Sequence, residues 1–270
     1  MPRALVTGSK GFVGQNLIKK LLNEGFTIKE VDDEYFSEKL WPHKFLHELD
    51  SESLDVIFHV GACTNTLETD VQSMMERNYE STKILSDWSS KNKIPIIYSS
   101  SAANLGTNGL YPSNLYGWSK YAAEGYVIKS GGVALRYFNV YGPGEDKKGK
   151  MASFLYQAII KQKRGEVVQL FPGEPKRDFI YIDDVVSANV YALRHYRELK
   201  SNYYEISTGV ASSFESVLGM ADIFFEYTKE SEIPAGYQFY TCGNPTKWMP
   251  GWRPLFPLER GIEDYLRRII

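Results

Sequence analysis

The sequence has few cysteines, no excess of basic residues and no long apolar run. Cys63 and Cys242 lie far apart and lack metal-motif spacing, so we expect two free thiols, no metal site and a reducing, cytoplasmic setting. The formal net charge is -2 with no long basic segment, which argues against a nucleic-acid partner. No apolar run reaches the ~18 residues that cross a bilayer. No signal-peptide pattern precedes the first predicted strand, and no membrane association is expected.

What the chain does contain is an ordinary globular balance, with 43% hydrophobic and 24% charged residues among 270. That length is sufficient for one large core or for two fused lobes. No internal repeat, low-complexity segment or long linker is visible in the sequence. Two lobes, if present, must therefore be interleaved along the chain.

The first motif lies near residue 1, where a strand, a glycine-rich turn and a helix follow one another. The apolar residues 4–6 lead into Thr7-Gly8-Ser9-Lys10-Gly11-Phe12-Val13-Gly14, and an amphipathic run follows over residues 15–22. Gly8 permits a tight turn, Gly11 lets the backbone approach a pyrophosphate, and Gly14 lets helix and strand pack closely. The helix N-terminus offers free N–H groups to phosphates. The pattern predicts a dinucleotide-binding site, the alternative being a glycine-rich loop without a ligand.

Two acids, Asp32 and Asp33, close the next apolar run at the distance that suits a ribose hydroxyl. For Asp33 the preferred interpretation is a residue of a solvated turn. The Asp32 carboxylate would repel a 2′-phosphate and therefore favours NAD over NADP, although Lys39 follows and could compensate.

Small and polar residues follow two further predicted strands, 54–60 and 94–98. The segment Gly61-Ala62-Cys63-Thr64 would let a cofactor lie against the first strand end, and Ser99-Ser100-Ser101 follows the second. Strand C-termini line the ligand crevice of an open α/β sheet. His59 is interpreted as a hydrogen-bonded core residue, because no second ligand stands at metal spacing. In the helical pattern of residues 71–88, Asn78 is a short amide that could face the cofactor.

Tyr116 and Lys120 lie four residues apart, on one face of a predicted helix that runs to about residue 129. An ammonium group beside a phenol would lower the phenol pKa from its ordinary value of ~10. A phenol so tuned exchanges a proton with a substrate alcohol, which a Ser101 hydroxyl can orient. Two surface residues would give the same spacing, but the glycine turn and the serine strand end favour catalysis.

The second half of the chain predicts strands at 133–140 and 203–208, and helices at 151–163, 213–228 and 258–269. On spacing alone, the highly charged residues 145–150 would form a solvated surface loop. Arg177 could hold a diphosphate bidentately, the alternative being a surface ion pair.

Taken together, the glycine turn, the serine strand end, Tyr116-x-x-x-Lys120 and Arg177-Asp178-Phe179-x-Tyr181 resemble an extended short-chain dehydrogenase/reductase. Within that group the chain is similar to the ADP-L-glycero-D-manno-heptose 6-epimerase family. The more specific segments that carry this similarity are Gly61-Ala62-Cys63-Thr64, Met74-Met75-x-x-Asn78-Tyr79, Arg136-Tyr137-Phe138-Asn139-Val140-Tyr141-Gly142-Pro143, Lys148-Gly149-x-Met151-Ala152-Ser153 and Lys176-Arg177-Asp178-Phe179.

The resemblance implies an NAD(P)-dependent nucleotide-sugar epimerase with a tightly bound cofactor. A hydride would leave C6 of a nucleotide-activated heptose and return to the other face of the carbonyl intermediate. Tyr116 would be one acid/base and Lys148 the second. The resemblance further assigns Phe12, Val13, Asp32, Asp33, Lys39, Asn78, Lys120 and Val140 to the cofactor, and Asn139, Lys150, Gln157, Phe171, Gly173, Arg177 and Tyr237 to the sugar nucleotide; Thr64 and Ser101 are added to the substrate side. These roles imply lipopolysaccharide biosynthesis and a homo-oligomer paired through helices 71–92 and 116–129.

The chain also departs from the pattern of that family. The segment between Asp32 and Leu54 is shorter, Lys150 replaces a serine and Gln157 replaces a histidine. Another sugar or base is therefore compatible with the same chemistry. The alternatives are a nucleotide-hexose 4-epimerase, 4,6-dehydratase or 4-reductase, and a dinucleotide-binding protein without turnover.

The expected fold is α/β, a Rossmann-type doubly wound parallel sheet with a smaller, interleaved C-terminal substrate lobe. We expect the dinucleotide-binding domain to comprise residues 1–141 and 177–209. Residues 142–176 and 210–270 would form the substrate lobe.

Overall fold

The computed structural model describes residues 1–32, 41–50, 53–107, 109–233 and 237–269. Its largest element is a six-stranded, wholly parallel sheet with the strand order β2-β1-β3-β4-β5-β9. The strands are β1 (Arg3–Thr7), β2 (Thr27–Val31), β3 (Val56–His59), β4 (Ile96–Ser101), β5 (Val133–Tyr137) and β9 (Asn202–Ile206). The order reverses between β1 and β3, which is the point where an open α/β sheet binds its ligand. The doubly wound fold predicted from the sequence is confirmed.

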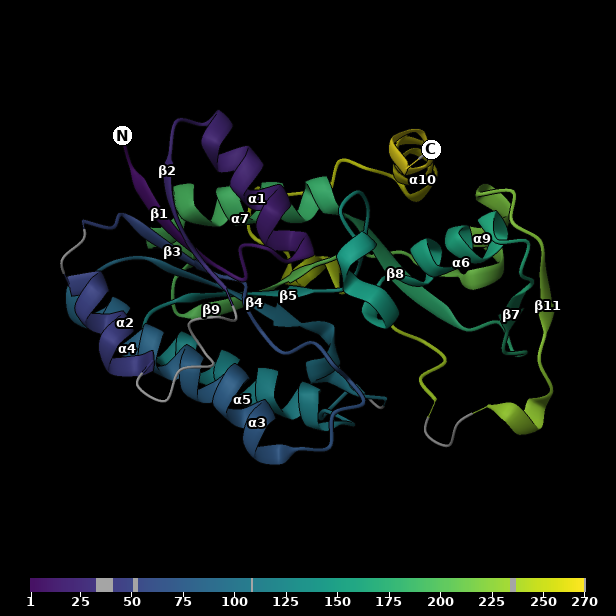
Figure 1. Ribbon diagram of the computed structural model, residues 1–270, viewed down its shortest axis with the longest axis horizontal. Helices are drawn as coiled ribbons and strands as arrows, with labels where there is room; N and C mark the ends of the chain where they lie inside the picture. Colours follow the sequence, from purple (N-terminus) through teal and green to yellow (C-terminus); the bar gives the residue numbers. More distant parts are fainter. Residues whose placement is uncertain (33–40, 51–52, 108, 234–236, 270) are drawn as a thin grey trace.

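Helices cover both faces of this sheet (Figure 1). On one face lie α1 (Phe12–Asn23) and α7 (Ile182–Arg194), and on the other lie α2 (Trp41–Asp50), α4 (Ser81–Asn92) and α5 (Leu115–Lys129). The short α3 (Val71–Met75) leads through a π-helical turn, Glu76–Glu80, into α4. The four central strands read as apolar runs because both of their faces are buried. Within the described ranges, no helix has the length and apolar character needed to cross a membrane.

A smaller lobe extends from the carboxyl end of the sheet (Figure 1). It contains the sheet β10-β8-β6, the parallel pair β11-β7 and the helices α6, α9 and α10. The bounds are β6 (Asn139–Tyr141), β7 (Val168–Leu170), β8 (Lys176–Tyr181), β10 (Ala211–Ser213), β11 (Phe225–Tyr227), α6 (Phe154–Lys163), α9 (Phe214–Met220) and α10 (Leu258–Ile269). The single-turn α8 (Tyr196–Leu199) follows α7 in the chain.

The predicted helix over residues 213–228 is correct only in its first half. After α9 the chain turns at Asp222, where φ is +54°, and Phe225–Tyr227 forms β11 beside β7. Strand pairing with a segment more than fifty residues away supplies the partners here, and local spacing does not reveal it.

Two buried carboxylates tie the smaller lobe to the sheet. Asp178 in β8 accepts hydrogen bonds from the N–H groups of Thr208 at 2.8 Å, Gly209 at 2.8 Å and Gly243 at 3.1 Å. Asp184 in α7 accepts from the N–H groups of Leu255 at 2.8 Å and Phe256 at 3.0 Å. These bonds satisfy loop backbone groups that no strand or helix would pair.

The glycine turn after β1 is packed too tightly for any side chain. A Cβ on Gly8 would lie 2.7 Å from the backbone of Gly61, and a Cβ on Gly14 would lie 2.1 Å from the carbonyl oxygen of Gly8. Gly8 also has a φ of +64°, which favours glycine. The close approach of α1 to β1, predicted from the glycine spacing, is present.

Replacing Gly14 with alanine should therefore be costly. We expect Gly14→Ala to lower the free energy of unfolding by about 1–3 kcal/mol through overpacking, measured by urea denaturation. The matched control is Gly219→Ala in α9, where an added Cβ meets no atom within 4 Å. Equal stability of the two variants would contradict the packing argument.

Candidate active site

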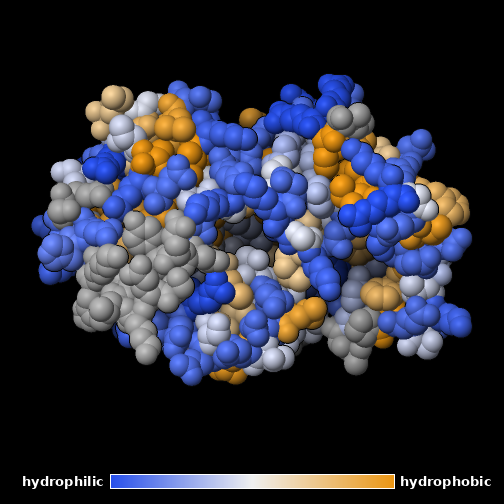
Figure 2. Space-filling view, viewed as in Figure 1, coloured by the Kyte–Doolittle hydropathy of each residue, from blue (hydrophilic) through white to orange (hydrophobic). Residues whose placement is uncertain are grey.

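Two adjoining cavities lie at the carboxyl ends of β1, β3 and β4. The first, beside the glycine turn, has a volume of about 400 Å³, and the second has a volume of about 450 Å³. The surface in Figure 2 is hollowed near the middle of the face shown, among mostly hydrophilic residues. The cavities form one continuous cleft because they share lining residues. These are Phe12, Val13, Val60, Ala62, Thr64, Lys148 and Met151.

The first part of the cleft has the features of a dinucleotide site. The N-cap of α1, Gly11, makes no side-chain hydrogen bond, so the first amides of this helix lack a side-chain cap. The carboxylate of Asp32 accepts a hydrogen bond from the Lys10 N–H at 2.6 Å and lines the same cavity. The other expected cofactor residues that line it are Gly8, Gly11, Phe12, Val13, Gly14, Gly61, Ala62 and Cys63.

A diphosphate fits this cradle, because the turn has no Cβ in the way and amides at its edge. Val140, also expected to touch the cofactor, lines the second cavity. Asp33 and Lys39 lie outside the described residues.

Asn78 lies behind the cleft wall, with an exposed fraction of 1%. Its Oδ1 accepts from the Cys63 N–H at 2.7 Å, and its Nδ2 donates to the Cys63 carbonyl at 3.0 Å and to Ser119 Oγ at 2.9 Å. Every polar atom of the amide is thus engaged with the protein. In this structure Asn78 holds the segment after β3 and does not line either cavity.

His59, the last residue of β3, is fully buried, and both of its ring nitrogens are hydrogen-bonded. It helps to hold the segment that follows β3. Thr7 Oγ1 accepts from the Gly61 N–H at 3.0 Å and lies 2.7 Å from His59 Nδ1. His59 Nε2 lies 2.9 Å from Thr82 Oγ1, whose hydroxyl donates to the Asn78 carbonyl at 2.6 Å. This chain assigns the proton to Nε2. The interpretation of His59 as a core residue is confirmed.

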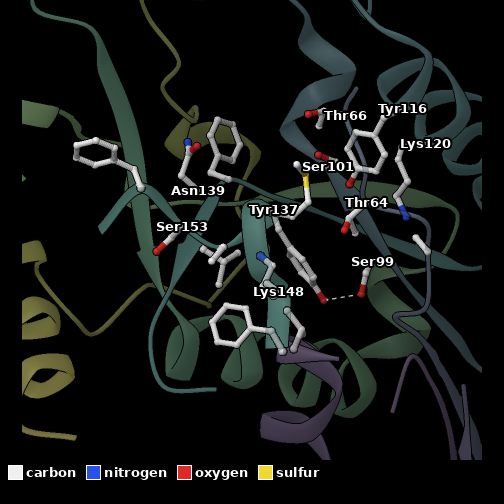
Figure 3. Close-up of a pocket in the computed structure, with 18 of the residues that line it drawn as sticks. Thr64, Thr66, Ser99, Ser101, Tyr116, Lys120, Tyr137, Asn139, Lys148 and Ser153 are labelled. Carbon is white, nitrogen blue, oxygen red and sulfur yellow. Dashed lines mark hydrogen bonds between the residues drawn. The ribbon is translucent and has the colours of Figure 1, made fainter. Parts of the chain in front are cut away.

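The catalytic candidates from β4 and α5 meet at the second cavity (Figure 3). Helix α5 begins at Leu115, where the Asn114 side chain caps it by accepting from the Gly117 N–H at 2.8 Å. Tyr116 in the first turn faces Ser101 at the end of β4. Lys120, one turn later, is 2% exposed, and its Nζ lies 4.2 Å from the ring centre of Tyr98.

The prediction that Lys120 lowers the phenol pKa is wrong. Desolvation raises the pKa of Tyr116, and the hydrogen bond with Ser101 only partly opposes it. Desolvation also lowers the pKa of Lys120 to about 7, against the attraction of Glu124. The ammonium is directed at Tyr98 and Glu124, so the pair lies on one helical face without the expected coupling.

Lys148 enters the cleft from the opposite side (Figure 3). It belongs to a short 3-10 segment, Asp146–Met151, between β6 and α6. Its Nζ lies 5.2 Å from the ring centre of Phe12, and it lines both cavities. Desolvation lowers the pKa of Lys148, while Glu145 raises it. The loop is therefore a wall of the cleft, to which Lys147 and Lys150 also contribute. Asp146, Lys147 and Lys150 are nevertheless exposed, as the spacing predicted.

Of the expected substrate residues, Thr64, Ser101, Asn139 and Lys150 line the second cavity. Gln157 is exposed, and its amide donates to the carbonyls of Lys150 at 3.2 Å and Ala152 at 2.8 Å. It supports the lysine loop instead of lining the cavity.

The other four expected substrate residues form a separate aromatic cluster beside the cleft. The rings of Phe171 and Tyr237 lie 5.0 Å apart, and the Arg177 guanidinium lies 5.6 Å from the ring of Tyr237. Arg177 also lies 5.5 Å from Phe214, which does line the second cavity. Gly173 packs against Phe239 in the same cluster.

Sequence reasoning missed several residues that line the second cavity. Tyr137 stands between the two sides in Figure 3, and its hydroxyl bonds Ser99 Oγ at 2.9 Å. The available signal was a tyrosine within the predicted strand 133–140. Phe154 and Phe214 come from the smaller lobe, and no local pattern marks them as cavity residues. In the described ranges, no cluster of three or more His, Cys, Asp or Glu could hold a metal ion.

A parallel dinucleotide-binding sheet, with Ser101 at the end of β4 and Tyr116 and Lys120 on helix α5, defines an enzyme that oxidises or reduces an alcohol carbon. The model of the NAD dependent epimerase/dehydratase family matches residues 4–207. The chain belongs to this family and is an NAD(P)-dependent nucleotide-sugar epimerase, an isomerase.

Individual relatives agree with this assignment. An ADP-L-glycero-D-manno-heptose-6-epimerase of Brachyspira hyodysenteriae is 35% identical over 97% of this chain and 96% of its own. The crystal structure of the enzyme of that name from Helicobacter pylori has a TM-score of 0.86 at 28% identity, covering 99% of this chain and 96% of that one. A UDP-glucose 4-epimerase of Thermotoga maritima has a TM-score of 0.85 at 24% identity, covering 99% of both chains, and shows the shared fold.

The buried His59 makes stability depend on pH. Burial, with a smaller contribution from Lys120, lowers the pKa of His59 to about 3. Below about pH 6.5 the histidine is therefore protonated in the unfolded chain but stays neutral in the folded protein. We expect this residue to reduce stability by up to about 1.4 kcal/mol per pH unit as pH falls from 6.5 towards 3. Urea denaturation of wild type and His59→Gln from pH 7 to 4 should give stability differences that shrink on acidification. Parallel curves would refute the assignment.

Proposed function

We propose that this enzyme interconverts two epimers at C6 of a nucleotide-activated heptose, as an ADP-glycero-manno-heptose 6-epimerase. The observation that carries the proposal is the placement of Tyr116 and Lys148 on opposite sides of one cavity (Figure 3). When the carbonyl intermediate turns over, its oxygen lies on opposite sides of the cavity in the two half-reactions, so an acid/base group is needed on each side.

In the proposed reaction the Tyr116 phenol exchanges the proton of the sugar hydroxyl, and Ser101 orients that hydroxyl. A nicotinamide dinucleotide in the first cavity would supply the hydride acceptor and then the hydride donor. The sugar becomes a carbonyl compound, turns over in the cavity and would receive the hydride on its other face. In that orientation Lys148 exchanges the second proton with the sugar oxygen. Nothing is oxidised or reduced overall.

The aromatic cluster of Phe171, Arg177 and Tyr237 is our candidate for the nucleotide end of the substrate. A guanidinium flanked by aromatic rings can bind a diphosphate while the rings stack on a base. Desolvation lowers the pKa of Arg177, and the guanidinium also donates to the carbonyls of Lys176 and Gln238. We propose that the smaller lobe, which adds β6 and β8 to the expected residues 142–176 and 210–270, supplies this substrate side.

For the cofactor, the position of Asp32 favours NAD over NADP. Its carboxylate lines the first cavity and is held against the glycine turn through the Lys10 N–H. A 2′-phosphate at this place would meet a negative charge. Mass spectrometry of cofactor released from purified protein distinguishes the two.

The proposed setting is a homo-oligomer in the cytoplasm that supplies lipopolysaccharide synthesis. Trp118 stacks on Tyr111 and meets Tyr121 edge-on, and the three rings are 46%, 59% and 40% exposed. Such a cluster on α5 supports an interface between copies of this chain.

Removing the phenol hydroxyl tests the acid/base role of Tyr116. We expect Tyr116→Phe to lower kcat by at least about 100-fold, since general acid–base catalysis contributes that much, while bound dinucleotide is retained. Turnover followed by NMR of the two epimers and cofactor content by mass spectrometry provide the readouts. Wild-type kcat in this variant would remove Tyr116 from the mechanism.

Lys148 separates the proposed reaction from epimerisation at C4 of a hexose. Lys148→Ala should reduce interconversion of the heptose epimers by about 100-fold or more, whereas a 4-epimerase acting on a hexose nucleotide should be insensitive to it. Asp146→Ala, on the same loop with an exposed side chain that lines neither cavity, is the matched control. Full activity of Lys148→Ala on the heptose would overturn the proposed role.

A further inference from the structure

The loop of residues 142–153 presents Lys148 to the cleft, yet little regular structure holds it. Between β6 and α6 it contains only the 3-10 segment Asp146–Met151, interrupted at Gly149, where φ is +53°. Asp146, Lys147 and Lys150 are exposed. The exception is Glu145, whose exposed fraction is 0%.

The carboxylate of Glu145 accepts hydrogen bonds from both ends of this loop. Its Oε1 accepts from the Gly142 N–H at 3.0 Å and the Ser153 hydroxyl at 2.9 Å, and Oε2 accepts from the Ser153 N–H. The Glu145 carbonyl accepts the N–H of Lys148 itself at 2.9 Å. Glu145 therefore closes the loop with its carboxylate and accepts a hydrogen bond from the backbone of Lys148, which the loop carries.

The same carboxylate connects the loop to the C-terminal helix. The Tyr265 hydroxyl of α10 donates to Glu145 Oε1 at 3.2 Å. On the other side, Asn16 Nδ2 of α1 donates to the Pro143 carbonyl at 2.9 Å, and Lys148 lies over Phe12 at the start of α1. The loop is thus fixed between α10 and the helix of the glycine turn.

All the groups around the Glu145 carboxylate are donors, which suits an ionised carboxylate and not an amide. In a glutamine, one oxygen is replaced by an NH2 group that would face an N–H or O–H donor. A buried donor left without an acceptor costs about 1–3 kcal/mol. The isosteric change should therefore open the loop without altering its volume.

We propose that Glu145 is the positioning residue for Lys148, closing the 142–153 loop so that the lysine stays at the junction of the two cavities. This inference rests on the proposed role of Lys148 in epimerisation. Glu145 does not touch the cavities and acts only through the loop.

The test compares Glu145→Gln with Asp184→Asn in the full-length protein. Asp184 is an equally buried carboxylate that accepts only backbone N–H bonds, from Leu255 and Phe256, and lines neither cavity. By hydrogen–deuterium exchange, we expect Glu145→Gln to accelerate exchange at Gly142 and Ser153 by at least about tenfold. Asp184→Asn should do so only at Leu255 and Phe256.

Kinetics then ask whether the loop acts on catalysis. Glu145→Gln should lower kcat for heptose epimerisation at least about tenfold with KM within about threefold of wild type, because binding is kept while the acid/base is misplaced. Asp184→Asn should retain kcat within about twofold. Tyr265→Phe removes one donor to the carboxylate and should change the exchange rates and kcat in the same direction by smaller factors. This variant replaces Glu145→Gln in the test if Glu145→Gln does not fold.

Wild-type protection of residues 142–153 in a folded Glu145→Gln, or an unchanged kcat in that variant, would overturn the proposal. Failure of the proposed function is distinguishable from this. If Lys148→Ala epimerises normally, the role of the lysine is lost, while the exchange experiment still decides whether Glu145 closes the loop.

Discussion

The close contact between the backbones after β1 and β3 is the constraint on which the cleft depends. An added Cβ at Gly8 or Gly61 would lie under 3.0 Å from the other turn, so the two strand ends can meet only because neither carries a side chain there. Buried hydrogen bonds that run from Thr7 through His59 to Thr82 fix the position of the two strand ends relative to each other. Asn78 holds the segment that follows β3. The floor of the dinucleotide site is thus held by close backbone contact and by buried hydrogen bonds.

The smaller lobe depends on a different interaction, the capture of loop N–H groups by buried carboxylates. Asp178, Asp184 and Glu145 have exposed fractions of 0%, 1% and 0%, and each accepts at least two backbone N–H groups. A lobe made of short strands leaves many amides unpaired, and each carboxylate can accept several of them. Substrate-side loops can then vary in sequence while their attachment to the sheet stays fixed.

Features set by neighbours in the sequence could be predicted from it. The glycine turn, the strand ends and the shared helical face of Tyr116 and Lys120 follow from spacing, and the structure contains each. Contacts across long separations could not be predicted: the amide of Asn78 faces Cys63, Phe225–Tyr227 pairs with β7, and Lys120 is directed at Tyr98. In the charged loop, composition rightly indicated exposure for most residues. Nothing in it distinguished buried Glu145 from its exposed neighbour Asp146.

Desolvation acts on the two proposed acid/base groups in opposite chemical senses. It raises the pKa of Tyr116 and lowers the pKa of Lys148, so in both cases the cavity favours the uncharged form. An uncharged phenol is a proton donor, and an uncharged amine is a proton acceptor. A reversible epimerisation needs a donor and an acceptor at the two faces of one carbon, with their roles exchanged in the reverse direction. A single physical cause, the exclusion of water from the cleft, therefore acts on both sides, and the charge of Glu145 shifts the pKa of Lys148 in the opposite direction.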